Sequence, residues 1–163
     1  SNNKLKESFA INFFGNDQDH VMLLAKKYSL QDNVSCMGAI DYLDCKKSEQ
    51  NSDILLIIMQ DTLNEKFAVT GKIFDLLQIK KNILMLYGKN SEAEEILKNS
   101  NLGSSYENPN ELTSALMSYL DGQFSATINT SYIDSMSRQN QVNLMLKFLH
   151  NHSSIKNYKE DKE

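Results

Sequence analysis

Short apolar runs alternate along the chain with polar segments in which apolar residues recur at helical spacing. The strongest run, Ile54–Ile58, consists of five apolar residues with no polar face. A strand of this composition is typical of a parallel sheet that helices cover on both sides. The pattern therefore predicts a strand at residues 53–59, placed centrally in such a sheet.

The same patterns predict the remaining elements. Further strands are expected at residues 9–14, 33–37, 82–86 and 102–106. Helices are expected at residues 19–28, 41–49, 70–79, 91–99, 110–120 and 132–150, the last with an apolar face of Val142, Leu144, Met145, Phe148 and Leu149. The alternation predicts an α/β fold with a doubly wound, mostly parallel sheet in three α/β/α layers. We expect residues 1–152 to form one domain and residues 153–163 a charged, frayed tail.

Two of these helices carry start signals. Ser91 and Glu94 have the spacing of a capping box, in which each residue satisfies a backbone N–H at the other's position. Pro109 stands near the start of the helix at residues 110–120, where its missing N–H costs nothing. The sequence therefore places both starts within a residue or two.

Composition and charge narrow the classes of function. The 163 residues carry a net charge of -4 with scattered lysines, which argues against nucleic-acid binding. No apolar run approaches the ~20 residues that a membrane span requires, so we expect a soluble chain without a transmembrane segment. Cys36 and Cys45 lack metal-ligand spacing, and two cysteines in a chain of this size favour a reduced, cytoplasmic protein.

The segment Thr70-Gly71-Lys72 is the clearest candidate for chemistry. It indicates a glycine-containing loop that feeds a helix, where free backbone N–H groups and the helix dipole favour a phosphate. Asp75 lies about one helical turn beyond Lys72, on the same face. A cation near a phosphate and a carboxylate near a hydroxyl suit a nucleotide sugar. Ligands of doubly wound sheets bind beyond the carboxyl ends of the strands, so the turns after Phe14, Met37 and Met59 should lie at the same edge.

The chain resembles the C-terminal, nucleotide-sugar-binding domain of GT-B glycosyltransferases, in the large family-4-like group (glycosyl transferases group 1). The sharpest match sets residues 70–84 against the motif T-G-K-x-F-E-Y-L-A-A-G-K-P-I-L of that family. Weaker matches follow the same order along the chain: Phe13-Phe14-Gly15, residues 32–38, residues 52–56, Asn101-Leu102-Gly103, and a closing helix through Ser137, Arg138, Gln141 and Leu144. Together they cover most of the chain.

The resemblance implies a Rossmann-like half of a GT-B fold, with a UDP- or GDP-linked sugar as substrate and neither a metal nor a separate cofactor. It assigns the donor diphosphate to Thr70, Gly71 and Lys72, and the donor ribose to Asp75. It places the base against Met37, Gly38 and Tyr42, and it makes Gly15, Asn16 and Glu65 candidates for the loop that contacts the sugar.

The resemblance also implies a longer enzyme. Its relatives build polysaccharides and glycoconjugates in bacteria, in the cytoplasm or peripherally at the inner face of the plasma membrane. An acceptor domain precedes the donor domain in cis and carries the groups that activate the acceptor, so no catalytic residue is assigned here and this half alone should be inactive. The Arg/Lys pair that grips the diphosphate also belongs to a segment upstream of this chain.

Three positions depart from the family pattern. The ribose-binding glutamate is Asp75 here, one methylene shorter, and the usual Gly-Lys-Pro turn is Lys80-Lys81-Asn82. A further acidic residue of many relatives falls on Phe67. These departures favour a second hypothesis, a degenerate α/β interaction domain without catalysis. A sugar-nucleotide epimerase of similar fold would need a histidine and acidic residues around the sugar, which the sequence does not provide.

Each candidate also has a purely structural interpretation. Thr70 would be an ordinary N-cap, Lys72 a solvated cation and Asp75 a carboxylate that favours a helix N-terminus. Met37 would be a core residue and Tyr42 a surface ring. Gly15 and Asn16 would only make a turn, and Glu65 would be a solvated charge.

Overall fold

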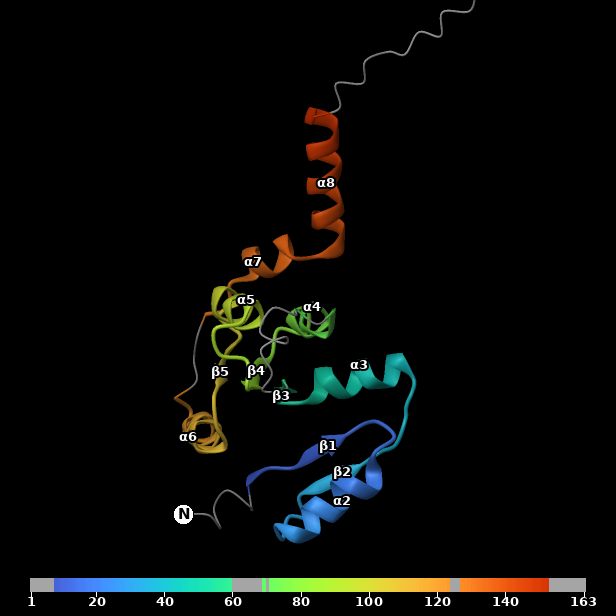
Figure 1. The fold of residues 1–163 in the computed structure, drawn as a ribbon, viewed down its shortest axis with the longest axis vertical. Coiled ribbons are helices and arrows are strands. Elements are labelled where there is room, and N and C mark those ends of the chain that lie inside the picture. Colours follow the sequence, from blue (N-terminus) through green and yellow to red (C-terminus); the bar gives the residue numbers. More distant parts are fainter. Residues whose placement is uncertain (1–7, 60–68, 70, 124–126, 153–163) are drawn as a thin grey trace, which may run out of the picture.

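The computed structural model describes residues 8–59, 69, 71–123 and 127–152. Its elements alternate as predicted, with every expected strand present among these residues. In chain order they are β1 (Ile11–Phe13), α2 (Gln18–Lys27), β2 (Val34–Cys36), α3 (Tyr42–Asn51), β3 (Ile54–Ile58), α4 (Gly71–Leu77), β4 (Asn82–Leu86), α5 (Glu92–Ser100), β5 (Gly103–Tyr106), α6 (Pro109–Leu120), α7 (Thr130–Ser135) and α8 (Arg138–His152). The α/β class is therefore confirmed (Figure 1).

All strand pairs in the described residues are parallel, but they form two small sheets. β1 pairs with β2, and β3, β4 and β5 form a second sheet in that order. Each parallel pair is joined through a helix, because parallel neighbours need a crossover connection. The arrangement is compatible with a three-layer, Rossmann-like fold.

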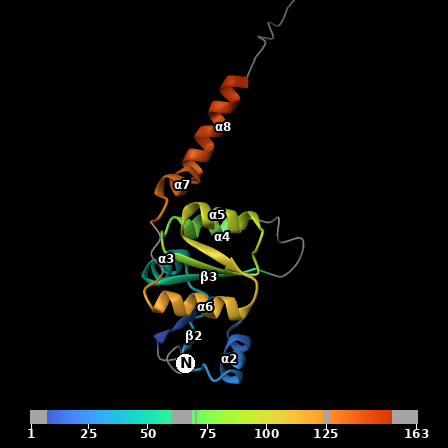
Figure 2. The ribbon, with the colours of Figure 1, turned by 90° about the vertical axis from the view of Figure 1, so that its left-hand side faces the viewer.

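The three-stranded sheet is the middle of three layers. Figure 2 shows α4 and α5 on one side of this sheet and α6 on the other. The main core lies between the sheet and helices α4 and α5. Its buried members are Leu55, Ile57, Met59, Ile73, Leu76, Leu77, Ile83, Met85, Ala93, Ile96, Leu97, Leu102 and Ile133.

β4, rather than β3, occupies the central position that the sequence predicted for residues 53–59. Leu84 and Leu86 of β4 are buried on the opposite face from the main core, so this strand is covered on both sides. On β3 only one face is buried, because Leu56 is 40% exposed and Ile58 is 60% exposed. In the strand order β3, β4, β5, β3 is also one of the two edge strands of the described sheet.

Local residues define the start and the end of α5 and let β5 lie close to β4. The Ser91 side chain accepts a hydrogen bond from the Glu94 N–H, so the predicted Ser91 cap forms. The Glu94 carboxylate accepts from the Asn90 N–H rather than from that of Ser91, whose N–H donates to the Gly88 carbonyl, so the reciprocal half of the capping box is shifted by one residue. Asn101 ends α5 in the left-handed conformation, with φ of 56°. Gly103 then lies so close to β4 that a Cβ atom would overlap the carbonyl oxygen of Ile83.

The segment predicted as one helix at residues 132–150 is two helices, so that prediction was wrong. The Ser137 hydroxyl caps α8 by accepting from the Asn140 N–H at 3.3 Å. The side-chain amides of Asn140 and Gln141 donate to the carbonyl oxygens of Asp134 and Ser135, at 2.6 and 2.9 Å. These bonds satisfy carbonyls at the end of α7 and end that helix without a glycine or proline.

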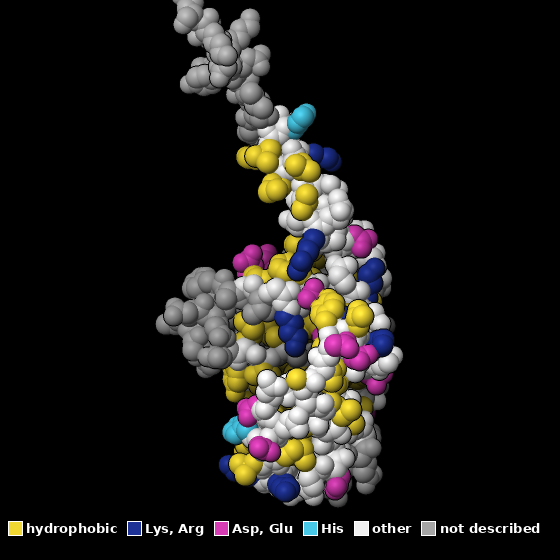
Figure 3. Space-filling view, turned by 90° about the vertical axis from the view of Figure 1, so that its right-hand side faces the viewer, with side chains coloured by type: hydrophobic (Ala, Val, Ile, Leu, Met, Phe, Trp, Pro, Cys, Tyr) yellow, Lys and Arg dark blue, Asp and Glu magenta, His cyan; other side chains and the backbone are white. Residues whose placement is uncertain are grey.

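The apolar face predicted for this region does not pack against the domain. α8 projects from the rest of the fold (Figures 1 and 2), and its apolar side chains are visible as a surface group in Figure 3. They are each about half-exposed: Val142, Leu144, Met145, Leu146, Phe148 and Leu149. Across the described ranges, none of the helices combines the length and apolar character that a membrane crossing needs.

Candidate functional site

The turns after β1 and β2 meet at their glycines. The Gly15 N–H donates to the Gly38 carbonyl oxygen at 2.9 Å, which joins the carboxyl ends of the two strands. Gly38 has a φ of 74°, and a Cβ atom there would approach the side-chain nitrogen of Gln18 to 2.7 Å. The backbone conformation favours glycine at this position, whereas the flexible end of the Gln18 side chain could move aside. Asn16, beside this junction, is exposed.

The candidate base-binding side chains lie on the surface beside this junction. The Met37 N–H continues the β1–β2 ladder by donating to the Phe13 carbonyl at 2.9 Å, while its side chain is 59% exposed. Met37 is therefore not a core residue, and the structural interpretation of it was wrong. Tyr42, at the first turn of α3, is 65% exposed. Both side chains are available to a flat ligand.

α4 places the candidate phosphate and ribose residues on its outer side. Ile73, Leu76 and Leu77 are buried in the core, which leaves Gly71 and Lys72 exposed and Asp75 half-buried. The helix is thus held by its apolar residues and presents the polar ones outward. Thr70 and Glu65 lie outside the described residues.

Lys46 connects the two candidate regions, and sequence reasoning missed it. Its ammonium lies 2.8 Å from the Glu49 carboxylate and 5.7 Å from the centre of the Tyr42 ring. Burial of this ammonium opposes its charge, but the hydrogen bond and charge of Glu49, then the charge of Asp75 and an interaction with Tyr42, raise the pKa of Lys46 above 10.5. The charge of Asp75 on α4 therefore acts on Lys46 of α3. We refer to Tyr42, Lys46 and Asp75 as one neighbourhood.

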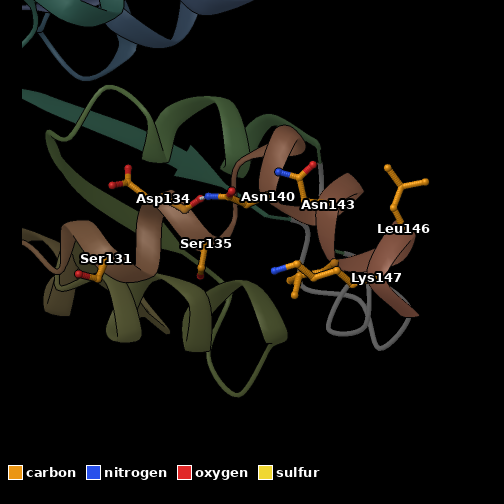
Figure 4. A pocket seen from close by; sticks show the side chains of 8 residues that line it. Ser131, Asp134, Ser135, Asn140, Asn143, Leu146 and Lys147 are labelled. Atoms are coloured by element: carbon orange, nitrogen blue, oxygen red, sulfur yellow. Dashed lines mark hydrogen bonds between the residues drawn. The ribbon is translucent and has the colours of Figure 1, made fainter. Parts of the chain in front are cut away.

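Two cavities of the described residues lie elsewhere. One of about 570 Å³ opens between α7 and α8 and is lined by Asp134, Ser135, Asn140, Lys147 and neighbouring residues (Figure 4). A second, of about 440 Å³, lies between α4, α5 and α7 and is lined by Phe74, Glu92, Tyr132 and others. Neither contains a residue predicted to bind the donor. In the part of the chain that the structure describes, no three His, Cys, Asp or Glu side chains converge as a metal site would require.

No protein-family model matches the chain, and no curated protein matches it with significant similarity. The resemblance to glycosyltransferases therefore depends on the ordered motif residues alone.

Proposed function

We propose that this chain is the donor-binding part of a glycosyltransferase, which takes a sugar from a nucleoside-diphosphate sugar for transfer to a polysaccharide or glycoconjugate acceptor. The observation that carries the proposal is the neighbourhood of Tyr42, Lys46 and Asp75. Through the effect of Asp75 on the pKa of Lys46, it relates a carboxylate of the glycine-lysine helix to the helix that follows the Gly15–Gly38 junction.

The chemistry of these groups suits the parts of such a donor. The exposed Tyr42 ring offers a face for a nucleobase, while the Asp75 carboxylate accepts two hydroxyl hydrogen bonds of a ribose. Lys72 and the backbone N–H groups at the start of α4 supply positive charge for a diphosphate. In the complete enzyme these groups would also stabilise the departing nucleoside diphosphate.

Lys46 has a specific part in this proposal. Its ammonium contacts the Glu49 carboxylate, and the charge of Asp75 on α4 adds to that of Glu49 in raising the pKa of Lys46. The donor site would span α3 and α4 rather than α4 alone.

The proposal is tested by thermal-shift titration of the chain with UDP, GDP, ADP and CMP. A nucleotide at 100 times its dissociation constant adds about 2.7 kcal/mol to the stability of the folded state. For a domain of this size that corresponds to a rise of about 5–10 °C in melting temperature. A rise with one base only is expected, and it would identify the donor class.

Two variants separate a nucleotide site from general anion binding. Asp75→Ala should abolish most of the shift, while Asp134→Ala, which removes an exposed carboxylate on α7, should leave it unchanged. Equal shifts for the wild type and Asp75→Ala would remove the proposed ribose contact. The absence of a shift with all four nucleotides would favour the degenerate interaction domain instead.

A further inference from the structure

The two sheets face each other through strands that each pair on one side only. Of the described strands, β1 pairs with β2 alone and β3 with β4 alone. In Figure 1, β1 is the strand of its pair that lies toward β3, and in both ribbon views β3 is the strand of the larger sheet that lies toward the smaller one. The order across the fold is therefore β2, β1, β3, β4 and β5, and in the described residues no strand pairing joins β1 to β3. We call this break in the strand pairing the interval between β1 and β3.

Backbone hydrogen bonds identify the groups that face this interval. The Met59 N–H donates to the Leu86 carbonyl of β4, and successive residues of a strand present their N–H groups to alternate sides. The N–H groups of Leu56 and Ile58 therefore point away from β4. By the same alternation, the bond from the Ile11 N–H to the Asn33 carbonyl leaves the Asn12 and Phe14 N–H groups pointing away from β2.

The packing of the N-terminal elements agrees with an incomplete sheet. Every described residue of the main hydrophobic core lies at or after Leu55, so β1, α2, β2 and α3 contribute none. The buried apolar residues of that N-terminal part are Ala25 and Val34. Two strands and a helix with so small a core are marginal in isolation. These elements need a further apolar layer to join them to the rest of the domain.

We propose that the interval between β1 and β3 is the position of an additional parallel strand, supplied by a segment of the same polypeptide upstream of residue 1. With that strand in place, the order becomes that of a Rossmann-type doubly wound sheet, in which the first strand lies between the second and the fourth. The strands β1 and β2 then progress outward in one direction and β3, β4 and β5 in the other.

The topology favours this source over a strand from a second copy. A strand upstream of β1, joined to it by one crossover, would make β1 its immediate neighbour, just as β2 neighbours β1 and β4 neighbours β3. Sequential strands are usually adjacent in this way. The required segment is a short run that is apolar on both faces, followed by a helix, because the strand would be central and covered on both sides.

The inference does not depend on the proposed function, but it bears on where any ligand binds. Ligands of doubly wound sheets occupy the crevice at the point where the strand order reverses, beyond the carboxyl ends. That point is the proposed strand, between the Gly15–Gly38 junction and the end of β3. It would explain why neither described cavity contains the candidate donor residues.

Hydrogen exchange of single amides tests the proposal. The 163-residue chain is compared with the chain extended upstream by about 30 residues of its own reading frame, the length of a strand and a crossover helix. The amides of Asn12, Phe14, Leu56 and Ile58 should exchange at least about tenfold more slowly in the extended chain. Ile57 and Met59, whose amides already face β4, serve as internal controls and should change less.

Equal exchange of these four amides in both chains would overturn the proposal, as would a reading frame too short upstream to encode the segment. Protection that is already present in the 163-residue chain and rises with its concentration would assign the interval to a second copy instead.

Cysteine cross-linking gives an independent result if the extended chain does not fold. In the 163-residue chain with Cys36 and Cys45 replaced by serine, Phe14→Cys is combined with Leu56→Cys or Ile58→Cys. Strands separated by one strand position lie about 9.6 Å apart, beyond the reach of a disulfide. The proposal therefore predicts no disulfide under mild oxidation. Rapid formation would mean that β1 and β3 pair directly and leave no room for a strand.

Discussion

Substitution of two neighbouring residues on β3 would test whether only one face of this strand is buried. Ile57 is 8% exposed and belongs to the main core, whereas Ile58 is 60% exposed on the opposite face. Ile57→Ala and Ile58→Ala remove the same atoms from the same strand. Any difference between them therefore reports burial and not β-propensity.

The expected magnitudes follow from these exposures. A buried isoleucine replaced by alanine costs about 2–5 kcal/mol, because the lost transfer free energy is joined by a cavity term. Ile58 is mostly in water already, so its replacement should cost about 1 kcal/mol or less. With a urea m-value of about 2 kcal/mol/M, Ile57→Ala should lower the unfolding midpoint by about 1–2.5 M, and Ile58→Ala by at most about 0.5 M.

Urea unfolding followed by circular dichroism gives both midpoints, and an unchanged m-value would show that the mutation altered stability alone. A cost for Ile58→Ala as large as that for Ile57→Ala would refute the reasoning, since it would mean that both faces of β3 are buried in solution.

Three further predictions concern local features of the fold. Ser91→Ala should lower the free energy of unfolding by about 1 kcal/mol, because the Glu94 N–H loses its cap, and Ser91→Asp should restore most of it in chemical unfolding. Gly103→Ala should lower the free energy of unfolding by about 1–3 kcal/mol or more, because the added methyl overlaps the Ile83 carbonyl oxygen. Gly122→Ala is the comparison, since Gly122 lies in a turn with open space around it but has a φ of 72°. A smaller loss of stability for Gly103→Ala than for Gly122→Ala would contradict the close approach. Burial raises the pKa of Tyr106 above 10.0. The contribution of the neutral Tyr106 phenol to the free energy of unfolding is complete below pH 10.0 and is lost as the pH rises through the higher folded-state pKa. The Tyr106→Phe variant should therefore lose less stability than the wild type between pH 9 and pH 12.

The elements that were predicted correctly depend on nearby residues. The apolar run of β4, the cap of α5 at Ser91, and the start of α6 at Pro109 each involve groups a few positions apart. Such signals are visible in a sequence because the interactions are local. The alternation of strands and helices was sufficient for the α/β class for the same reason.

The errors arose where distant or unusual contacts decide the structure. The break between α7 and α8 has no glycine or proline, and it depends on the Asn140 and Gln141 side chains bonding back to α7. The edge position of β3 could not be predicted from its composition, because five apolar residues also suit a central strand. An apolar pattern indicates that both faces of a strand are buried, but it does not indicate whether another strand pairs with each of its edges.

The candidate site was predictable only in part. The conformation at Gly38 follows from a turn, and the outward direction of Asp75 follows from the spacing of Ile73, Leu76 and Leu77. Lys46 lies one helical turn after Tyr42, so its contact with that ring could have been expected from spacing. Its interaction with Asp75 could not, since it requires the packing of α3 and α4.

Calorimetric titration of Asp75 variants with the nucleoside diphosphate that stabilises the chain tests the central claim most directly. A charged hydrogen bond to ribose is worth about 1.5–3 kcal/mol, so Asp75→Ala should weaken binding by about 10- to 150-fold. Asp75→Glu, which restores the side-chain length of the resembled family, should bind at least as tightly as the wild type. Unchanged affinity in Asp75→Ala would contradict the assignment of Asp75 to the donor ribose, and with it the proposed site.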